Sequence, residues 1–225
     1  MGKPWLVFGG WAVSPDILRP VFGEESIYVD INEIMPLLSD DDRLIDDWVD
    51  IVKNNIAGYL TKEIAGIAGW STGAIMACGL AQHIHVKRLV LLSATPSFCR
   101  RDGFRFGQRS SIVQAMIDKM EDKNNSVVND FLIQCGLREN KIMTKVYNEK
   151  ALVLGLMFLE KVNLIGALKK AEGEVFVVHG RDDKVIPYQA GEALAGMIGA
   201  DFKICSGSHA FFVEQAGEVK KIVSG

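Results

Sequence analysis

The feature that most constrains the fold is an alternation of short apolar segments with longer helical ones. The short runs rich in Val, Ile and Leu are expected to be strands, at residues 5–8, 26–30, 64–68, 88–93, 175–179 and 201–205. Most are apolar almost throughout, which is typical of strands covered on both faces. Helical patterns run over residues 41–56, 72–83, 188–198 and 213–223. This alternation predicts an α/β fold with a mostly parallel sheet flanked by helices.

One long segment, residues 95–171, interrupts the alternation. It contains no convincing strand, and helical stretches are expected around residues 109–122, 125–135, 139–147 and 150–160. An all-helical insertion between two strands of a parallel sheet is typical of a lid, which gives substrate choice and excludes water. We therefore expect one core domain made of residues 1–94 and 172–225 and a helical lid made of residues 95–171.

Composition excludes several classes of protein. The formal net charge of −3 is too small to predict nucleic-acid binding through a basic surface. No apolar run reaches the ~18 residues that span a bilayer, so no membrane association is expected. The four cysteines are scattered without a Cys-x-x-Cys pair, which disfavours a zinc site, and no export signal is recognisable. We expect a cytoplasmic monomer with reduced cysteines.

The pentad Gly69-Trp70-Ser71-Thr72-Gly73 lies between an expected strand and an expected helix. In that context Gly-x-Ser-x-Gly predicts a nucleophile elbow, a sharp turn that holds the serine in a strained conformation. The serine then lies at a helix N-terminus, where the helix dipole favours developing negative charge. A glycine-bounded turn whose serine only caps the helix is the alternative. We predict Ser71 as a nucleophile.

A serine hydroxyl is a weak nucleophile unless a neighbouring base takes its proton. Of the four histidines, His83 and His85 end the helix after the serine and lie too far along it to reach back. His179 is expected to pack at the end of a strand. His209 lies in a loop of small residues between the last strand and the last helix, and it is the predicted base.

The acid is expected in the loop after residues 175–179. Asp182 and Asp183 are adjacent, so both cannot point at the same imidazole. The spacing to the flanking glycine and proline favours Asp183, with Asp182 as the alternative. The resulting chain order, Ser71, Asp183, His209, is that of the α/β-hydrolase fold and differs from other serine-hydrolase folds.

The loop after the first strand, Gly9-Gly10-Trp11-Ala12, is expected to lie near this serine. In α/β-hydrolases the corresponding loop gives one backbone N–H to the oxyanion site, and the residue after the nucleophile gives another. We therefore predict the main chains of Trp11 and Thr72 as the donors. A tight turn with Trp11 as a core aromatic is the alternative, and both can hold together.

With these motifs placed, the chain resembles the pimeloyl-[acyl-carrier protein] methyl ester esterases, the carboxylesterases of biotin synthesis. The resemblance rests on the elbow Gly69-Trp70-Ser71, the pair Gly10-Trp11, the lid pair Phe131-Leu132, and Ser208-His209-Ala210-Phe211 around the base. Two positions depart from the family: Gly9 replaces the usual histidine of the oxyanion loop, and Ala12 replaces its last glycine.

The resemblance implies hydrolysis of a methyl ester at the far end of an acyl chain carried by acyl-carrier protein, through an acyl-enzyme on Ser71. It implies no metal or organic cofactor. It also implies an apolar tunnel for the acyl chain, with Trp11, Trp70, Phe131 and Phe158 as candidate lining residues. Plain core or lid packing is the alternative for at least half of them.

The family binds its acidic carrier with lid arginines flanking the Phe131 position, where this chain has Ser126 and Asp130 at two of the places. The candidate carrier contacts here are Arg100, Arg101, Arg105 and Arg109 at the lid entrance, and Lys141 and Lys145 within the lid. An ordinary solvated face is the alternative for either group.

Three other functions stay open from the sequence. A general short-chain carboxylesterase or thioesterase would share the catalytic residues and differ in the lid. A ligand-binding module would keep the triad without turnover. A purely structural or interaction protein is the third, and the intact triad argues against it.

Overall fold

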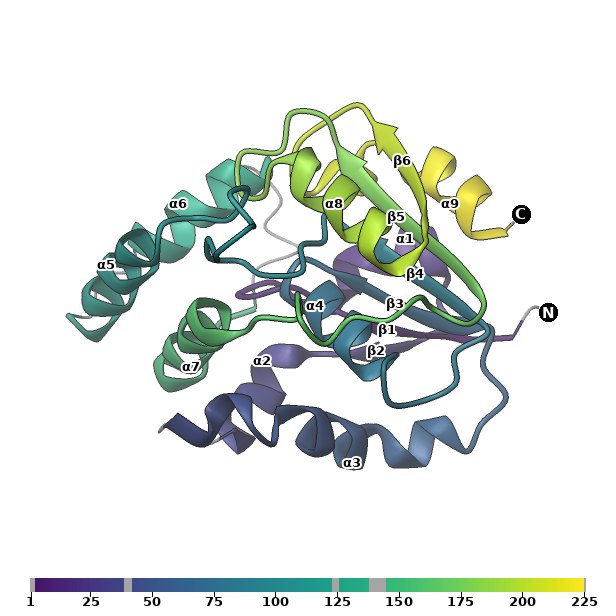
Figure 1. Ribbon diagram of the computed structural model, residues 1–225, viewed down its shortest axis with the longest axis horizontal. Coiled ribbons are helices and arrows are strands. Elements are labelled where there is room, and N and C mark those ends of the chain that lie inside the picture. Colours follow the sequence, from purple (N-terminus) through teal and green to yellow (C-terminus); the bar gives the residue numbers. More distant parts are fainter. Residues whose placement is uncertain (1–2, 39–41, 123–125, 138–144, 225) are drawn as a thin grey trace.

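The computed structural model describes residues 3–38, 42–122, 126–137 and 145–224. Within these residues, six strands form one parallel sheet (Figure 1). In order across the sheet they are β2 (Ile27–Val29), β1 (Trp5–Phe8), β3 (Gly66–Trp70), β4 (Arg88–Leu92), β5 (Glu174–Gly180) and β6 (Asp201–Cys205). The register pairs Phe8 with Gly69 and Leu92 with Val178, so the carboxyl ends of the strands meet along one edge. The predicted mostly parallel α/β sheet is confirmed.

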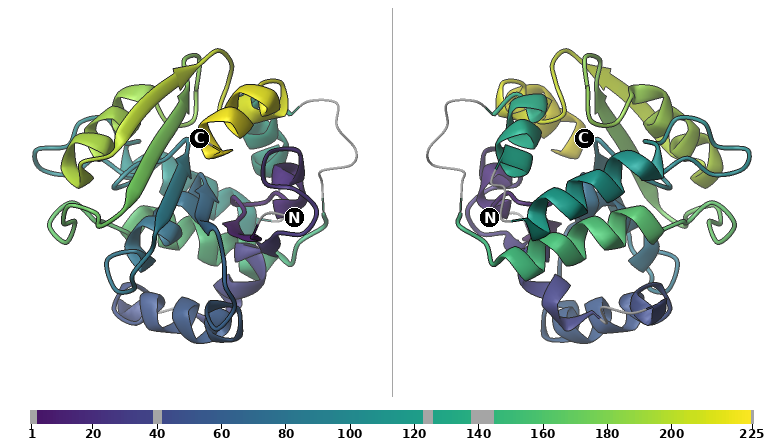
Figure 2. Two further views of the ribbon diagram at one scale, coloured as in Figure 1. Left: turned by 90° about the vertical axis from the view of Figure 1, so that its right-hand side faces the viewer. Right: turned by 90° about the vertical axis from the view of Figure 1, so that its left-hand side faces the viewer.

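The sheet is covered on both faces by helices (Figure 2). On one face lie α4 (Thr72–Leu80) and α8 (Tyr188–Ile198), with α3 (Trp48–Leu60) packed outside α4. On the other lie α1 (Arg19–Phe22) and α9 (Ala216–Ser224), which contact each other. All residues of α4 are buried, because this helix lies between the sheet and α3.

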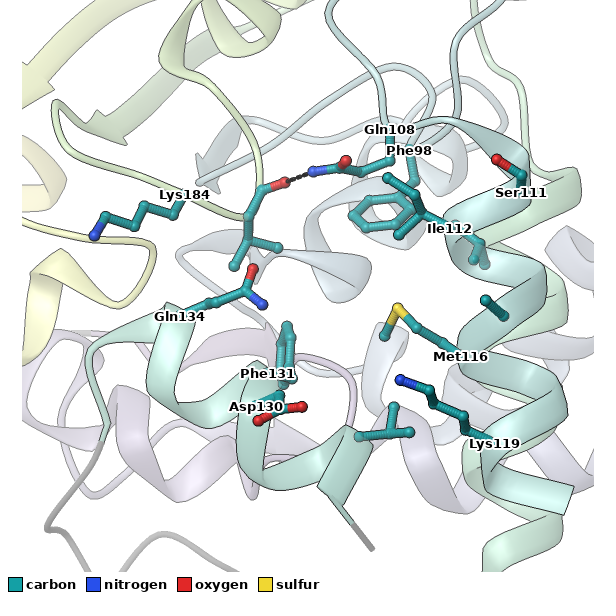
Figure 3. A pocket seen from close by; sticks show the side chains of 14 residues that line it. Phe98, Gln108, Ser111, Ile112, Met116, Lys119, Asp130, Phe131, Gln134 and Lys184 are labelled. Atoms are coloured by element: carbon teal, nitrogen blue, oxygen red, sulfur yellow. Dashed lines mark hydrogen bonds between the residues drawn. The ribbon is translucent and has the colours of Figure 1, made fainter. Parts of the chain in front are cut away.

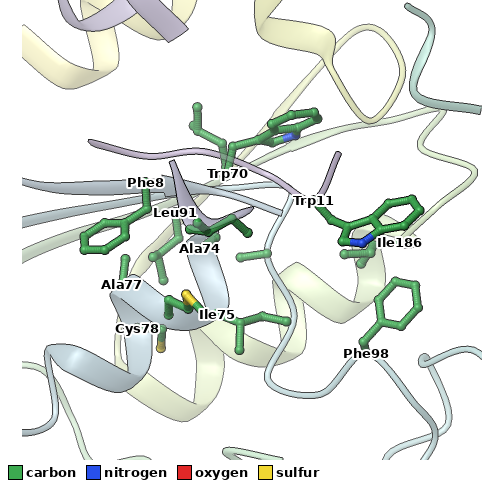
Figure 4. Packing of buried hydrophobic residues seen from close by; sticks show 14 of the residues in the cluster. Phe8, Trp11, Trp70, Ala74, Ile75, Ala77, Cys78, Leu91, Phe98 and Ile186 are labelled. Carbon is green, nitrogen blue, oxygen red and sulfur yellow. The ribbon is translucent and has the colours of Figure 1, made fainter. Parts of the chain in front are cut away.

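The core between the sheet and α4 combines large strand residues with small helix residues. Phe8 of β1 and Leu91 of β4 lie against Ala74, Ala77 and Cys78 of α4 (Figure 4). Small side chains on the helix allow its axis to approach the sheet closely. The start of α4 lies at the carboxyl edge of the sheet, directly after β3.

Three helices come between β4 and β5, in the segment expected to form a lid: α5 (Ser110–Glu121), α6 (Ser126–Cys135) and α7 (Glu149–Lys161). They lie beyond the carboxyl ends of the strands (Figure 1). Helix α5 packs on α7, and α7 packs on α2 (Ile31–Ile34). The remaining short elements are the 3-10 turns Pro15–Leu18, Met35–Leu37, Asp42–Ile45 and Phe211–Val213.

Some predicted boundaries were wrong. The helix expected over residues 41–56 is instead a 3-10 turn followed by α3, which begins only at Trp48. The helix expected over residues 139–147 lies partly outside the described residues, and its described part is not helical. The next helix, α7, begins after Asn148, whose extended backbone and side chain cap its start. None of the helices in the described ranges is both long and apolar enough to cross a bilayer.

Candidate active site

Ser71 lies at the turn from β3 into α4, with φ +56° and ψ −121°, a backbone conformation that L-residues rarely adopt. Its N–H donates to the carbonyl of Leu92 at 3.0 Å, and its side chain is almost entirely buried. The turn needs glycine two residues later, because a Cβ at Gly73 would lie 2.1 Å from the carbonyl oxygen of Gly9. This is the geometry of the predicted elbow.

The imidazole of His209 lies against the carboxylate of Asp183. Its Nδ1 is 2.7 Å from Asp183 Oδ2, and both side chains are fully buried. Asp182, the alternative acid, is exposed to solvent. The structure therefore pairs His209 with Asp183.

The carboxylate of Asp183 is surrounded by donors. Its Oδ1 accepts from the main-chain N–H groups of Val185 and Ile186, each at 2.8 Å. Its Oδ2 accepts from His209 and also from His179, whose Nε2 is 3.0 Å away. Burial by itself would raise the pKa of Asp183, but the charge of His209 and the hydrogen bonds from both imidazoles lower it well below its usual range. The acid is ionised at neutral pH.

His179 is a site residue whose partner the sequence did not reveal. It was expected to pack at a strand end, and it is fully buried at the end of β5. Its Nε2 lies within hydrogen-bond distance of both Asp183 Oδ2 and the carbonyl of Ile186, at 2.9 Å. Because both partners are acceptors, Nε2 carries the proton. The sequence feature that could have indicated this contact is the spacing of His179, four residues before Asp183.

The arrangement also fixes the proton of His209. Since the ionised carboxylate accepts from Nδ1, the lone pair of the neutral imidazole lies on Nε2. This Nε2 is buried and has no hydrogen-bond partner among the described residues, so the hydroxyl of Ser71 is not bonded to it here. Catalytic hydrogen bonds often tighten only when substrate is bound.

The main chain of His209 is anchored next to the elbow. Its carbonyl accepts from the indole N–H of Trp70 at 3.0 Å and from the hydroxyl of Ser93 at 2.8 Å. The ring of Trp70 also lies 5.4 Å from the imidazole, centre to centre. Because Trp70 precedes Ser71 directly, these contacts bring the histidine to the side of the turn.

The loop Gly9–Ala12 lies against the first turn of α4. The indole of Trp11 is buried and donates to the carbonyl of Leu152 in α7 at 2.9 Å. Among the described residues, no acceptor bonds the main-chain N–H of Trp11. The N–H of Thr72 belongs to the first turn of α4, where helices leave N–H groups unpaired. Both predicted oxyanion donors are therefore available.

A cavity of about 540 Å³ opens between α5 and α6 (Figure 3). Its apolar wall includes Phe98, Ile112, Met116 and Phe131. The ring of Phe131 also lies 5.0 Å from the ring of Trp11 and 6.3 Å from that of His209. Phe131 therefore lines the cavity and also lies close to the imidazole.

Three of the four predicted tunnel residues, Trp11, Trp70 and Phe158, do not line this cavity. Trp70 packs against the rings of His209 and Phe212, and Phe158 packs edge-on against Trp48 of α3 at 5.4 Å. Both are fully buried, so in this structure they are packing residues.

The predicted carrier contacts fall into three groups. Arg100, Arg105 and Arg109 are exposed before α5. Arg101 is folded inward, and its Nη2 donates to the carbonyls of Glu160 and Val162 at the end of α7. Lys145 pairs with Asp30 and Glu33, and Lys141 lies outside the described residues.

The sheet order, the strained turn and the histidine–aspartate pair at one edge define a class: the chain has the α/β-hydrolase fold. An esterase (EaEST) from Exiguobacterium antarcticum superposes with a TM-score of 0.77 at 16% identity, covering 99% of this chain and 91% of that one. MenH from S. aureus superposes with a TM-score of 0.74 at 19% identity, covering 100% and 93%.

Among curated proteins, the chain is similar to the pimeloyl-[acyl-carrier protein] methyl ester esterases. It is 24% identical over 162 residues to the one from Nitrosomonas europaea, which covers 66% of this chain and 62% of the relative. It is 26% identical over 168 residues to one from Xylella fastidiosa (strain M23), covering 67% and 66%. The chain thus matches less than two thirds of these relatives' length. No family model matches it.

Proposed function

We propose that this chain is a serine carboxylic ester hydrolase with Ser71 as nucleophile, His209 as base and Asp183 as the acid that orients the base. One observation carries the proposal. Beside the strained elbow serine, a fully buried imidazole is held by an ionised carboxylate on one nitrogen, and its other nitrogen has no partner within the part of the chain that the structure describes. A buried nitrogen without a hydrogen bond is costly, and this one is explained by a proton that it receives during reaction.

In the proposed mechanism, His209 Nε2 takes the proton of Ser71 as the hydroxyl attacks the ester carbonyl. The main-chain N–H groups of Trp11 and Thr72 face the oxyanion that forms. His209 then protonates the departing alcohol, and the acyl group stays on Ser71. A water molecule that gives its proton to His209 releases the acid, and Ser71 recovers its proton. Asp183 stays ionised throughout, because its pKa lies below the usual range.

The substrate that we propose is the methyl ester of a pimeloyl-type acyl chain on acyl-carrier protein. The names of the curated relatives support this choice. So does the cavity between α5 and α6, whose volume falls within the roughly 300–1,000 Å³ of small-molecule sites. The acyl chain would lie in this cavity, with the ester beside Phe131, and residues 95–171 would act as the lid.

The carrier would dock on the exposed arginines before α5. Arg100, Arg105 and Arg109 have solvent-exposed side chains and can meet an acidic partner. Arg101 and Lys145 contribute less in this proposal, because Arg101 is folded inward onto two carbonyls and Lys145 is paired with two carboxylates. Arg100 donates through Nε to the carbonyl of Gly107 but keeps an exposed side chain. A cytoplasmic monomer that binds neither nucleic acid nor membrane stays a prediction.

The test compares the unmodified protein with Ser71→Ala on a p-nitrophenyl short-chain ester and on the carrier-bound methyl ester. Ser206→Ala is the matched control, because this exposed serine lies in the same loop as His209. We expect full activity in the control and none above background in Ser71→Ala. Equal hydrolysis by the unmodified protein and Ser71→Ala would end the catalytic proposal.

The same assay separates the alternatives. The specific esterase is supported if the carrier-bound methyl ester is hydrolysed faster than the same methyl ester without the carrier. The rate on the carrier-bound ester should also fall as salt is added. Equal rates on free esters and thioesters would point to a general hydrolase. Saturable binding without turnover would point to a ligand-binding module.

A further inference from the structure

The side chain of Asn32 joins both sides of the peptide that carries the proposed oxyanion donor. Asn32 lies in the first turn of α2, and only 2% of its surface is exposed. Its Oδ1 accepts from the N–H of Ala12 at 2.9 Å, and its Nδ2 donates to the carbonyl of Gly10 at 3.1 Å. The residue between these two bonds is Trp11.

The backbone that Asn32 holds is in an unusual conformation. Ala12 has φ +57°, in the left-handed region that residues with a Cβ disfavour. Gly10 is pressed against the indole of Trp70, since a Cβ at Gly10 would lie 2.8 Å from two ring carbons. A non-glycine residue keeps such a backbone conformation only where surrounding contacts impose it. Here those contacts are the two hydrogen bonds from Asn32 and the packing of Gly10 on Trp70.

We propose that Asn32 is a positioning residue that holds the main-chain N–H of Trp11 at the oxyanion site; this role rests on the proposed hydrolase function. A primary amide presents a donor and an acceptor side by side, which is what a carbonyl and an N–H two residues apart require. An aspartate at this position lacks the donor, and an alanine lacks both groups.

We call the two hydrogen bonds of Asn32 to Gly10 and Ala12 the Asn32 clamp. The clamp is connected to the segment that leads into α7. Asn32 Nδ2 also donates to Asp30 Oδ1 at 3.0 Å. Asp30 Oδ2 in turn accepts from the hydroxyl of Tyr147 at 3.0 Å and from Lys145 Nζ at 3.2 Å. The indole bond from Trp11 to Leu152 is a second link to α7. The oxyanion loop and this end of the helical insertion are therefore held together.

The first experiment measures kcat and KM for a p-nitrophenyl ester in Asn32→Ala and Asn32→Asp. We expect kcat to fall by about 10- to 100-fold, somewhat less than when an oxyanion donor is deleted outright, with KM little changed. Asn163→Ala is the control, because Asn163 is an exposed asparagine that accepts one local main-chain bond. We expect its kcat to be unchanged.

A second readout distinguishes oxyanion positioning from general damage. A trifluoromethyl ketone forms a tetrahedral adduct with the serine, so its inhibition constant should rise by the same factor as kcat/KM falls. The inhibition constant of the product carboxylate should stay constant. A folded Asn32→Ala protein that keeps its kcat and its affinity for the ketone would overturn the proposal.

Amide hydrogen exchange tests the clamp without any activity. The N–H of Ala12 should be protected in the unmodified protein and should exchange faster in the Asn32 variants. If the unmodified protein is inactive but this pattern is seen, the proposed function fails and the hold on the loop stands. If neither Asn32 variant folds, Tyr147→Phe is the deciding variant, because Tyr147 bonds Asp30, which in turn bonds Asn32. Faster exchange of the Ala12 N–H together with a lower kcat supports the proposal. An unchanged exchange rate and an unchanged kcat overturn it.

Discussion

The hydrogen bond from His179 to Asp183, the proposed acid, gives the sharpest prediction. His179 and His209 share Asp183 Oδ2, at 3.0 and 2.7 Å, and His179 does not face the serine turn through any described contact. Its expected effect on turnover is therefore indirect, through the position and charge of the acid. His179→Ala removes the ring and the bond. His179→Gln places an amide N–H near the position of Nε2 and tests the bond separately from the shape.

The magnitude follows from burial and charge. A hydrogen bond to a charged group contributes about 1.5–3 kcal/mol, and removal of a buried ring costs about 3–5 kcal/mol by cavity formation. We expect His179→Ala to lose stability on the scale of that cavity term and His179→Gln to recover part of it. If about half of the bond energy, about 0.8–1.5 kcal/mol, is felt in the transition state, kcat falls about 3- to 12-fold in His179→Ala, because about 1.4 kcal/mol is a factor of ten.

The effect on stability should depend on pH. The pKa of Asp183 is lowered in the folded protein, so its interactions stabilise the fold fully above the unfolded carboxyl pKa of about 3.9. That contribution is lost as pH falls through the lower folded value. Removing a donor raises the folded pKa, so the stability difference between the unmodified protein and His179→Ala should narrow as pH falls below about 4.

Urea unfolding at pH 7 and at steps from pH 4 down to pH 2, together with kcat on a p-nitrophenyl ester, checks these expectations. The reasoning is refuted if His179→Ala keeps full turnover, or if the stability difference from the unmodified protein does not narrow over this acid range. Equal losses in the alanine and glutamine variants would show that the ring acts by packing alone.

Three further predictions follow from close packing. Gly73→Ala should cost about 1–3 kcal/mol of stability and lower kcat, because its Cβ would meet the carbonyl of Gly9. Gly58→Ala is the control, since a Cβ at this exposed position of α3 meets nothing within 4 Å. In urea unfolding the control should be neutral or stabilising. Phe131→Ala should change KM more than kcat and weaken the preference among acyl-chain lengths in a series of p-nitrophenyl esters. Ile133→Ala is the comparison, because Ile133 is exposed on the same helix. All four cysteines are buried, and burial raises the pKa of Cys78 to about 12. A thiol reagent at pH 8 should therefore label the cysteines only in denaturant. Rapid labelling of the native protein would contradict this expectation.

The sequence by itself determined the strand and helix alternation, the glycine-bounded turn at Ser71 and the order of the proposed catalytic residues. These features are local: a run of β-branched residues favours a strand wherever it lies, and Gly69 satisfies a steric need within the turn itself, where a Cβ would meet Gly73. The choice of Asp183 over Asp182 also came from local spacing. Parallel pairing then brings the ends of β3, β5 and β6 to one edge, which is why a pattern read along the chain predicts a site.

Only the tertiary structure decided which distant groups each polar side chain meets. Asn32 bonds a loop 22 residues away, and Arg101 folds onto carbonyls about 60 residues away instead of facing solvent. His179 had the pattern of a buried strand residue, and its bond to Asp183 depends on how the loop after β5 turns back. Local sequence specifies the conformation of a segment, but hydrogen-bond partners across the fold depend on how packed layers place those segments, and that placement is fixed only when the whole core assembles.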